Sequence, residues 1–272
     1  MESFIIQDWK LFAPIHTGGE KTYAHLDTGA IGNMLSASKL DNAEVIDEKT
    51  MMGAMGEQQV KEVRIKDLTF LEQEFDHTKA VIFDGEQYFG DVPFPVTMTL
   101  GATVLLAKPL ILDFKRLWLG FAESPVRADI PAYPMDFANG LPFLELNAGK
   151  TKLQTIFDTG AAYSLFNLAH ETEAAWEFEE IYQLEALDPT GARSLIPVFE
   201  LKNVTIGDVQ LGKMEIVKVD LTAIEQRLDK RVDFVLGANA LISSGLVWVL
   251  DSAKETIYIS EHDVNVCVQG RE

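Results

Sequence analysis

The chain has a single cysteine, Cys267, so no disulfide bond can form within it. It also has no stretch of about 18 uninterrupted apolar residues, the length that a membrane-spanning helix needs, so we expect no membrane span. The first residues, MESFIIQDWKLF, lack the basic segment and long apolar run of a signal peptide. These absences leave the compartment open: a cytoplasmic protein and a mature exported form whose leader has been removed both fit.

Basic residues are few, with 23 Lys and Arg against 42 Asp and Glu, which gives a net charge of −19 at pH 7. Nucleic acids and anionic membranes would repel such a surface, so we expect neither as a partner. Solubility is the simplest explanation of the acidity. The alternative that stays open is a preference for cationic substrates. The 47% of apolar residues is ordinary for a folded, water-exposed protein.

Metal-ligand patterns are missing as well. His16, His77, His170 and His262 do not have the spacing of a metal site, and no phosphate-binding loop pattern is present. We therefore expect no metal and no cofactor. His25 has a structural role in our interpretation, and a proton shuttle is the alternative.

What the chain does contain is a repeated tetrapeptide, Asp-Thr-Gly-Ala, at residues 27–30 and again at residues 158–161. Leu26 precedes the first copy and Phe157 precedes the second. Two such copies would arise by chance in on the order of one chain in 10⁵. The copies start 131 residues apart, close to half the length of the chain, which indicates an internal repeat.

The sequence around each copy repeats in the same order. A strand-like segment enters each Asp-Thr-Gly, a helix-like segment follows, then a glycine-bearing hairpin, and then an alternating strand. In the first half these segments are 21–26, 33–40, 52–57 and 60–65, and in the second half they are 153–157, 164–170, 188–192 and 204–209.

A second signature, Leu-Gly-Ala, closes each half. Gly101 lies 74 residues after Asp27, and Gly237 lies 79 residues after Asp158. A helical segment and a strand ending in Leu-Asp follow each copy, and we expect the acids of that pair, Asp113 and Asp251, to cap turns. Three prolines between residues 123 and 134 indicate a linker. The sequence therefore predicts an all-β protein with short helices, built of two lobes, residues 1–127 and 128–272, related by a pseudo-twofold axis.

Two identical acids on two identical turns suggest one shared site. Like charges a few ångströms apart cannot both ionise, so one carboxyl group becomes an acid and the other a base. Peptide hydrolysis without a metal or a covalent nucleophile needs such a pair. We therefore expect Asp27 and Asp158 to be the catalytic residues.

This set of motifs resembles the retropepsin-like aspartic proteases, in a single-chain, bilobal form like that of the pepsin-like enzymes. The resemblance covers about residues 10–122 and 138–260. It implies two β-barrel lobes, each carrying one catalytic Asp, and a monomer that hydrolyses an extended peptide or protein substrate. It also implies that Thr28, Gly29, Thr159 and Gly160 position the two acids. Asn33 departs from the family, because a small hydroxyl residue is common at that place.

The resemblance further implies two flaps over the substrate. The first would contain Gly53, Ala54, Met55 and Gly56, and the second would contain Thr190 and Gly191. The alternative function is a non-catalytic peptide- or protein-binding module on the same fold. A glycosidase could also use two carboxylates, but it would not require two symmetric turns.

Overall fold

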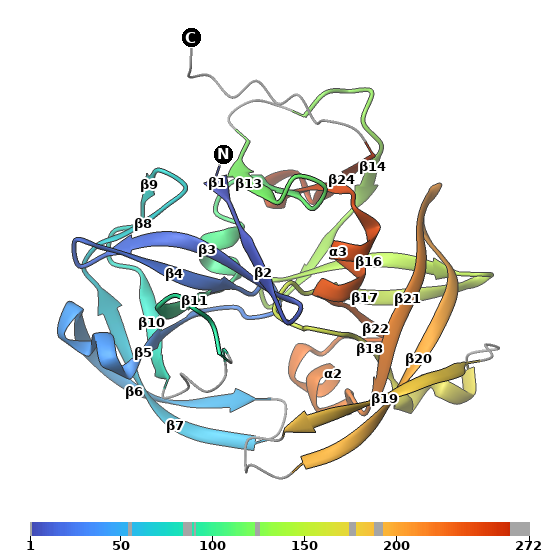
Figure 1. Ribbon diagram of the computed structural model, residues 1–272, viewed down its shortest axis with the longest axis horizontal. Helices are drawn as coiled ribbons and strands as arrows, with labels where there is room; N and C mark the ends of the chain where they lie inside the picture. The colour runs from blue at the N-terminus through green and yellow to red at the C-terminus, as the bar shows by residue number, and fades with distance from the viewer. Residues whose placement is uncertain are drawn as a thin grey trace.

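The computed structural model describes residues 2–53, 56–83, 89, 91–122, 126–173, 178–187 and 193–261. The protein is all-β with short helices, as predicted, and it is bilobal. Figure 1 shows the N-terminal strands in blue to green on one side and the C-terminal strands in yellow to red on the other. The predicted flap residues Ala54, Met55, Thr190 and Gly191 lie outside the described residues.

The first lobe contains a ten-stranded sheet with the order β6-β7-β10-β5-β11-β4-β3-β8-β9, and β2 pairs with β3. Strand β5 lies between β10 and β11, parallel to the former and antiparallel to the latter. The strands are β2 (Ile5–Gln7), β3 (Lys10–Thr17), β4 (Glu20–Leu26), β5 (Asn33–Ser36), β6 (Ala43–Gly53), β7 (Gly56–Ile65), β8 (Leu68–Phe70), β9 (Gln73–Glu74), β10 (Lys79–Phe83) and β11 (Val96–Leu100).

The second lobe contains an eight-stranded sheet with the order β15-β16-β17-β22-β18-β21-β20-β19. It repeats the central pairing of the first lobe, since β18 lies between β21, to which it is parallel, and β22, to which it is antiparallel. The strands are β15 (Asp136–Ala138), β16 (Leu141–Ala148), β17 (Thr151–Phe157), β18 (Ser164–Asn167), β19 (Glu179–Leu187), β20 (Arg193–Ile206), β21 (Val209–Val219) and β22 (Phe234–Leu236).

A six-stranded sheet joins the halves, with the order β1-β13-β12-β23-β24-β14. Its central pair consists of the two Leu-Asp strands, and Leu112 lies opposite Trp248. In Figure 1 this sheet lies above both lobes. Its strands are β1 (Glu2–Ser3), β12 (Leu110–Asp113), β13 (Trp118–Phe121), β14 (Ala132–Pro134), β23 (Val247–Asp251) and β24 (Thr256–Ser260).

The main hydrophobic core runs through both halves without a break. It includes Leu26, which is 1% exposed, and Phe157 and Trp248, which are fully buried. The rings of Phe157 and Trp248 pack with centroids 5.5 Å apart. The residue before each Asp-Thr-Gly is therefore anchored in the shared core, which holds both loops at the junction of the lobes.

The predicted helices after the two Asp-Thr-Gly loops were wrong in part. Residues 33–36 and 164–167 are strands, β5 and β18, and only the following residues are helical. Pairing on both sides within a buried sheet outweighs a weak local helical preference over so short a segment. The 3₁₀-helices are η1 (Ala37–Asn42), η3 (Leu168–Glu173) and η4 (Ser252–Lys254).

The predicted strand at residues 204–209 is also wrong, because it contains a turn. Gly207 has a φ of 51°, in the left-handed region, and it separates β20 from β21. The α-helices are short: α1 (Ala102–Leu105), α2 (Thr222–Leu228) and α3 (Ala238–Ser244). No helix among the described residues is long and apolar enough to cross a membrane.

Two long hairpins lie along one side of the molecule, at the lower edge of Figure 1. Strands β6 and β7 form the first, and Gly53 pairs with Gly56 at its end. Strands β19 and β20 form the second, with Leu187 opposite Arg193. The two predicted hairpins therefore exist, and each ends its own sheet at an edge strand, β6 or β19.

Candidate active site

The two Asp-Thr-Gly loops begin at equivalent places in the two lobes. Asp27 follows β4, and its backbone N–H donates to the carbonyl of Leu100 over 3.0 Å. Asp158 follows β17, and its N–H donates to the carbonyl of Leu236 over 3.1 Å. Each acid is thus fixed by the parallel strand that ends in Leu-Gly-Ala, which explains why the two signatures repeat together.

Thr28 and Thr159 bind each other's loop across the pseudo-twofold axis. The N–H of Thr28 donates to the hydroxyl oxygen of Thr159 over 3.0 Å, and the N–H of Thr159 donates to that of Thr28 over 3.0 Å. Each hydroxyl in turn donates over 2.9 Å to a backbone carbonyl of the opposite lobe, that of Phe157 or Leu26. Both threonines are buried, so these bonds are shielded from water and lock the loops together.

Gly29 and Gly160 allow the loops to approach closely. A Cβ atom on Gly29 would lie 2.2 Å from the Cγ atom of Asp158, and a Cβ atom on Gly160 would lie 2.2 Å from the Cγ atom of Asp27. Any larger residue would push the opposite carboxyl group away. The glycines are therefore required by the carboxylate of the other lobe, and not by the turn alone.

The carboxyl groups of Asp27 and Asp158 share a hydrogen bond. Burial, followed by the charge and hydrogen bond of Asp158, raises the pKa of Asp27 well above its usual range. Burial also raises the pKa of Asp158. Both side chains are half-buried, so they remain in reach of a ligand. The pair therefore retains a proton at a pH at which isolated carboxyl groups are ionised.

Both acids accept backbone N–H groups of their own loops, and for Asp27 these are the N–H groups of Gly29 and Ala30. One carboxylate oxygen of Asp158, Oδ1, accepts the N–H of Gly160 over 2.8 Å and that of Ala161 over 3.1 Å. These bonds favour its ionised form. For Asp27 the hydrogen bond with Asp158 has the opposite effect and raises the pKa further. The shared proton therefore belongs to the pair of carboxyl groups.

The Leu-Gly-Ala junctions support the loops from behind. The N–H of Ala102 donates to the carbonyl of Ala30 over 2.8 Å, and the N–H of Ala238 donates to that of Ala161 over 2.8 Å. Gly101 has the Gly32 carbonyl oxygen only 2.2 Å from where a Cβ atom would be. The glycine of this signature is therefore needed because backbone from the acid loop passes over it.

The same hydrogen bonds hold the Leu-Gly-Ala junction in both lobes, but different residue types form them. In the first lobe Asn33 accepts the N–H of Gly101 over 2.9 Å and donates to the carbonyl of Lys79 over 3.0 Å. In the second lobe these two bonds are divided between Ser164, which accepts the N–H of Gly237 over 3.0 Å, and Asn239, which donates to the carbonyl of Glu215 over 2.7 Å. The departure at Asn33 therefore keeps the hydrogen bonds of the junction.

Asp113 and Asp251 cap turns, as predicted. Asp113 accepts the N–H groups of Lys115 and Arg116 over 3.0 and 2.8 Å, and Asp251 accepts that of Lys254 over 3.2 Å. His25 is fully buried, and burial, with a smaller effect of Lys10, lowers its pKa to about 3. The ring is therefore neutral at physiological pH, which favours the structural role over a proton shuttle.

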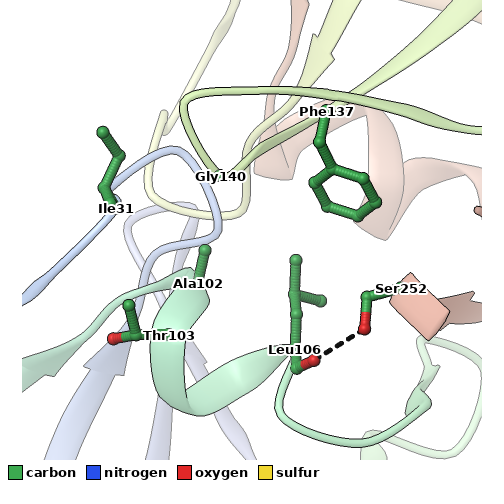
Figure 2. Close-up of a pocket in the computed structure, with 7 residues that line it drawn as sticks. All are labelled: Ile31, Ala102, Thr103, Leu106, Phe137, Gly140 and Ser252. Atoms are coloured by element: carbon green, nitrogen blue, oxygen red, sulfur yellow. Dashed lines mark hydrogen bonds between the residues drawn. The ribbon is translucent and has the colours of Figure 1, made fainter.

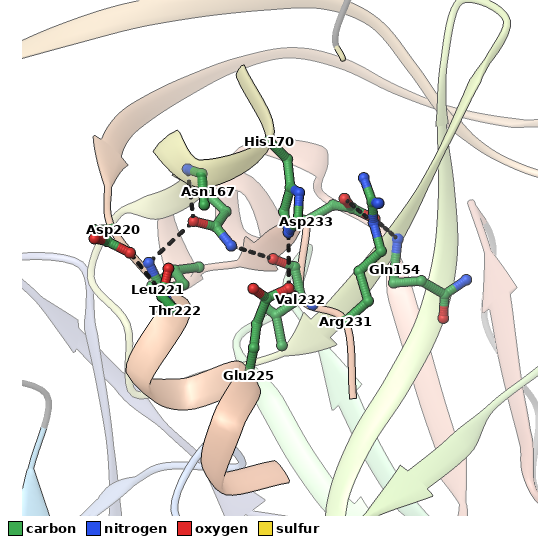
Figure 3. A network of polar contacts seen from close by, with 11 residues as sticks. Gln154, Asn167, His170, Asp220, Leu221, Thr222, Glu225, Arg231, Val232 and Asp233 are labelled. Carbon is green, nitrogen blue, oxygen red and sulfur yellow. Dashed lines mark hydrogen bonds and ion pairs between the residues drawn. The ribbon is translucent and has the colours of Figure 1, made fainter. Parts of the chain in front are cut away.

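A polar network stiffens the scaffold of the second acid (Figure 3). Asp233 accepts the N–H of Gln154 over 2.8 Å, and its own N–H donates to the Gln154 carbonyl over 2.9 Å. Gln154 lies on β17, the strand that leads into Asp158. His170 contacts Glu225 over 2.8 Å, which fixes α2 against η3. The spacing of His170 in the sequence predicted no metal site, and its side chain makes this contact with Glu225.

Three residues near the acid loop of the second lobe were not predicted from the sequence. The hydroxyl of Tyr182, on β19, donates to the Oε2 atom of Glu215 over 2.6 Å. The hydroxyl oxygens of Tyr163 and Tyr182 lie 3.4 Å apart. Tyr163 lies five residues after Asp158, so this chain of contacts connects the acid loop with the second hairpin. The pairing of β19 with β20, and of β20 with β21, brings Tyr182 and Glu215 together.

A shallow pocket of about 270 Å³ lies beside the first acid loop (Figure 2). Ile31, Leu106 and Phe137 give it an apolar lining, and Ser252, whose hydroxyl donates to the Leu106 carbonyl over 2.8 Å, closes one side. Among the described residues, no group of three or more His, Cys, Asp and Glu side chains could hold a metal ion.

No profile of a known protein family matches the sequence, and a comparison with curated proteins gave no match either. Among solved structures, the chain is similar to the aspartic proteinase from Irpex lacteus. The TM-score is 0.60, the sequence identity is 12%, and the match covers 99% of this chain and 99% of that chain. At this identity the similarity is one of fold: the chain has the bilobal, all-β fold of an aspartic proteinase over its whole length.

Proposed function

We propose that the protein is an aspartic endopeptidase in which Asp27 and Asp158 form the catalytic dyad. The observation that carries the proposal is the reciprocal contact of the two Asp-Thr-Gly loops. Each loop places its carboxyl group where the glycine of the other loop leaves room, and the pKa values of both carboxyl groups are raised. Strongly perturbed carboxyl groups that meet at a junction of lobes are typical of catalytic sites.

The two acids divide the roles of base and acid between them because they share one proton. Asp158, whose carboxylate accepts two backbone N–H groups, would take a proton from the attacking water. Asp27 would give the shared proton to the carbonyl oxygen of the scissile peptide bond. A tetrahedral diol results. As its C–N bond breaks, the proton on Asp158 passes to the leaving nitrogen, and one diol hydroxyl returns its proton to Asp27 as the C=O bond of the product acid re-forms. Each carboxyl group thus acts once as a donor, and the cycle needs no metal and no cofactor.

The substrate would be an extended peptide or a segment of a protein. The hairpins β6–β7 and β19–β20 lie on the same side of the molecule, and each ends in an edge strand with unpaired backbone groups. An extended chain can bind such edges through its own backbone. Gly53 and Gly56 would flank the tip of the first flap. Because one chain supplies both acids, lobes of residues 1–127 and 128–272 would form a complete site in a monomer.

Digestion of a diverse peptide library, with products identified by mass spectrometry, tests the proposal. The wild-type chain should cleave internal peptide bonds, and Asp27→Asn and Asp158→Asn should each abolish cleavage while the circular dichroism spectrum stays unchanged. Asp113→Asn is the matched control, because an amide oxygen can still cap the turn and activity should persist. A folded wild-type chain that binds statine peptides but cleaves nothing between pH 3 and 8 would instead support a non-catalytic binding module.

A further inference from the structure

The second lobe carries an unusual carboxylate close to its acid loop. Glu215, on β21, is half-buried and accepts the hydroxyl of Tyr182. Within the described part of the chain, no Lys or Arg forms an ion pair with it. Its cross-strand neighbour Glu200 differs, because Lys202 and Lys213 lie 2.9 and 3.2 Å from its oxygens. Among the described residues, Glu215 therefore has no ion-pair partner, and in this it differs from Glu200.

Two tyrosine rings accompany this charge. Tyr182 is 39% exposed, and Tyr163 is partly exposed beside it. Burial and the hydrogen bond to Glu215 raise the pKa of Tyr182, so its hydroxyl stays protonated and donates to the carboxylate. A carboxylate next to two accessible aromatic faces is the combination that binds an ammonium or guanidinium group, through an ion pair and cation–π contacts.

These residues lie within reach of a peptide bound at the dyad. Tyr163 is five residues after Asp158, so its Cα atom lies at most about 18 Å from that of the acid. A bound peptide advances about 3.3 Å per residue in extended form, and the long phenol ring extends from the loop toward the second hairpin, where it meets Tyr182. Side chains a few residues from the scissile bond would pass this position.

We propose that Tyr163, Tyr182 and Glu215 form a specificity subsite for a lysine or arginine side chain of the substrate. This inference rests on the proposed function, and it names the substrate class as peptides with a basic residue on the side that lies over the second lobe. The net charge of −19 at pH 7 would add long-range attraction for such peptides.

The first lobe does not repeat this subsite. Asn33 donates to the carbonyl of Lys79, as Asn239 does to that of Glu215, so Lys79 is the pseudo-twofold equivalent of Glu215. The equivalent of Tyr163 is Gly32. The charge is therefore reversed and the aromatic ring is missing on that side. A peptide with one basic residue would accordingly bind in a single orientation.

Binding of statine-centred heptapeptides, measured by fluorescence polarisation, tests the subsite without relying on cleavage. Lysine, norleucine or glutamate occupies each flanking position in turn. At one position the lysine peptide should bind about tenfold more tightly than the norleucine peptide. Glu215→Gln keeps an acceptor for Tyr182 but removes the charge, and it should abolish that preference. The control Glu200→Gln removes a charge that two lysines neutralise, and it should leave the preference unchanged.

Each outcome separates the subsite from the catalytic proposal. Equal binding of lysine and norleucine peptides at all positions, or a preference that survives Glu215→Gln, overturns the subsite even if the chain is a protease. A lysine preference that depends on Glu215 in a chain that cleaves nothing supports the subsite and refutes the endopeptidase. Tyr182→Phe keeps the ring and loses the bond that orients Glu215, so it should reduce the preference without abolishing it.

Discussion

The reciprocal threonine contacts give a quantitative prediction for Thr28→Val. Valine has nearly the same shape, but it can neither accept the N–H of Thr159 nor donate to the carbonyl of Phe157, bonds that measure 3.0 and 2.9 Å. Both groups are at a buried position. Each of these two buried polar groups costs about 1–3 kcal/mol when it is left without its partner, so the free energy of unfolding should fall by roughly 2–6 kcal/mol.

Thermal and urea unfolding, followed by circular dichroism, measure this loss. For a chain of this length the expected loss lowers the Tm by roughly 5–15 °C. Thr99→Val is the matched control, because Thr99 is equally buried and its hydroxyl has no hydrogen-bond partner among the described residues. Removing that hydroxyl should leave the stability unchanged or raise it.

A double-mutant cycle sharpens the test. Since Thr28 and Thr159 bind each other's loop, the effects of Thr28→Val and Thr159→Val should not add, and the coupling energy should be about 1 kcal/mol or more. A loss below about 0.5 kcal/mol for Thr28→Val, no larger than that of an ordinary surface substitution, would refute the reasoning. The lobes would then be held by the shared core alone.

Two further predictions concern the acids and their glycines. Gly160→Ala places a Cβ atom 2.2 Å from the Cγ atom of Asp27, so kcat/KM for peptide cleavage should fall by about 100-fold or more. Gly32→Ala, whose Cβ atom would meet nothing within 4 Å, should keep its activity; equal losses in the two variants would contradict the steric argument. Because the pKa of Asp27 is raised in the folded state, the stability that its protonated form contributes is present below the unfolded pKa of about 3.9 and is lost as pH rises through the folded pKa. In urea titrations, the free energy of unfolding of Asp27→Asn should therefore rise relative to that of wild type between pH 4 and pH 7. A difference between the two proteins that does not change with pH would show that the pKa of Asp27 is not raised.

The central part of the site was predictable because it depends on local sequence. The pairing of Asp-Thr-Gly with a later Leu-Gly-Ala implies a loop and the strand that supports it, and the structure brings these elements together in both lobes. The roles of Asp27 and Asp158 in catalysis stay a prediction.

Other features depend on contacts between distant strands, and the sequence alone did not predict them. Residues 33–36 have a weak helical pattern, but β10 and β11 make them a strand. The chain from Tyr163 through Tyr182 to Glu215 joins three segments whose spacing carries no motif. A comparison of the two halves could have shown that Asn33 corresponds to Ser164, since both occur six residues after the acid. The hydrogen bonds that make this exchange harmless join residues far apart in the sequence, so only the structure shows them.

Non-additivity of the two acid substitutions tests the central claim most directly. We compare kcat/KM for one peptide substrate in wild type, Asp27→Asn, Asp158→Asn and the double variant. If the two lobes contribute halves of a single site, each single variant should lose about as much activity as the double variant. A single variant with wild-type activity, or losses that multiply in the double variant, would contradict a shared dyad.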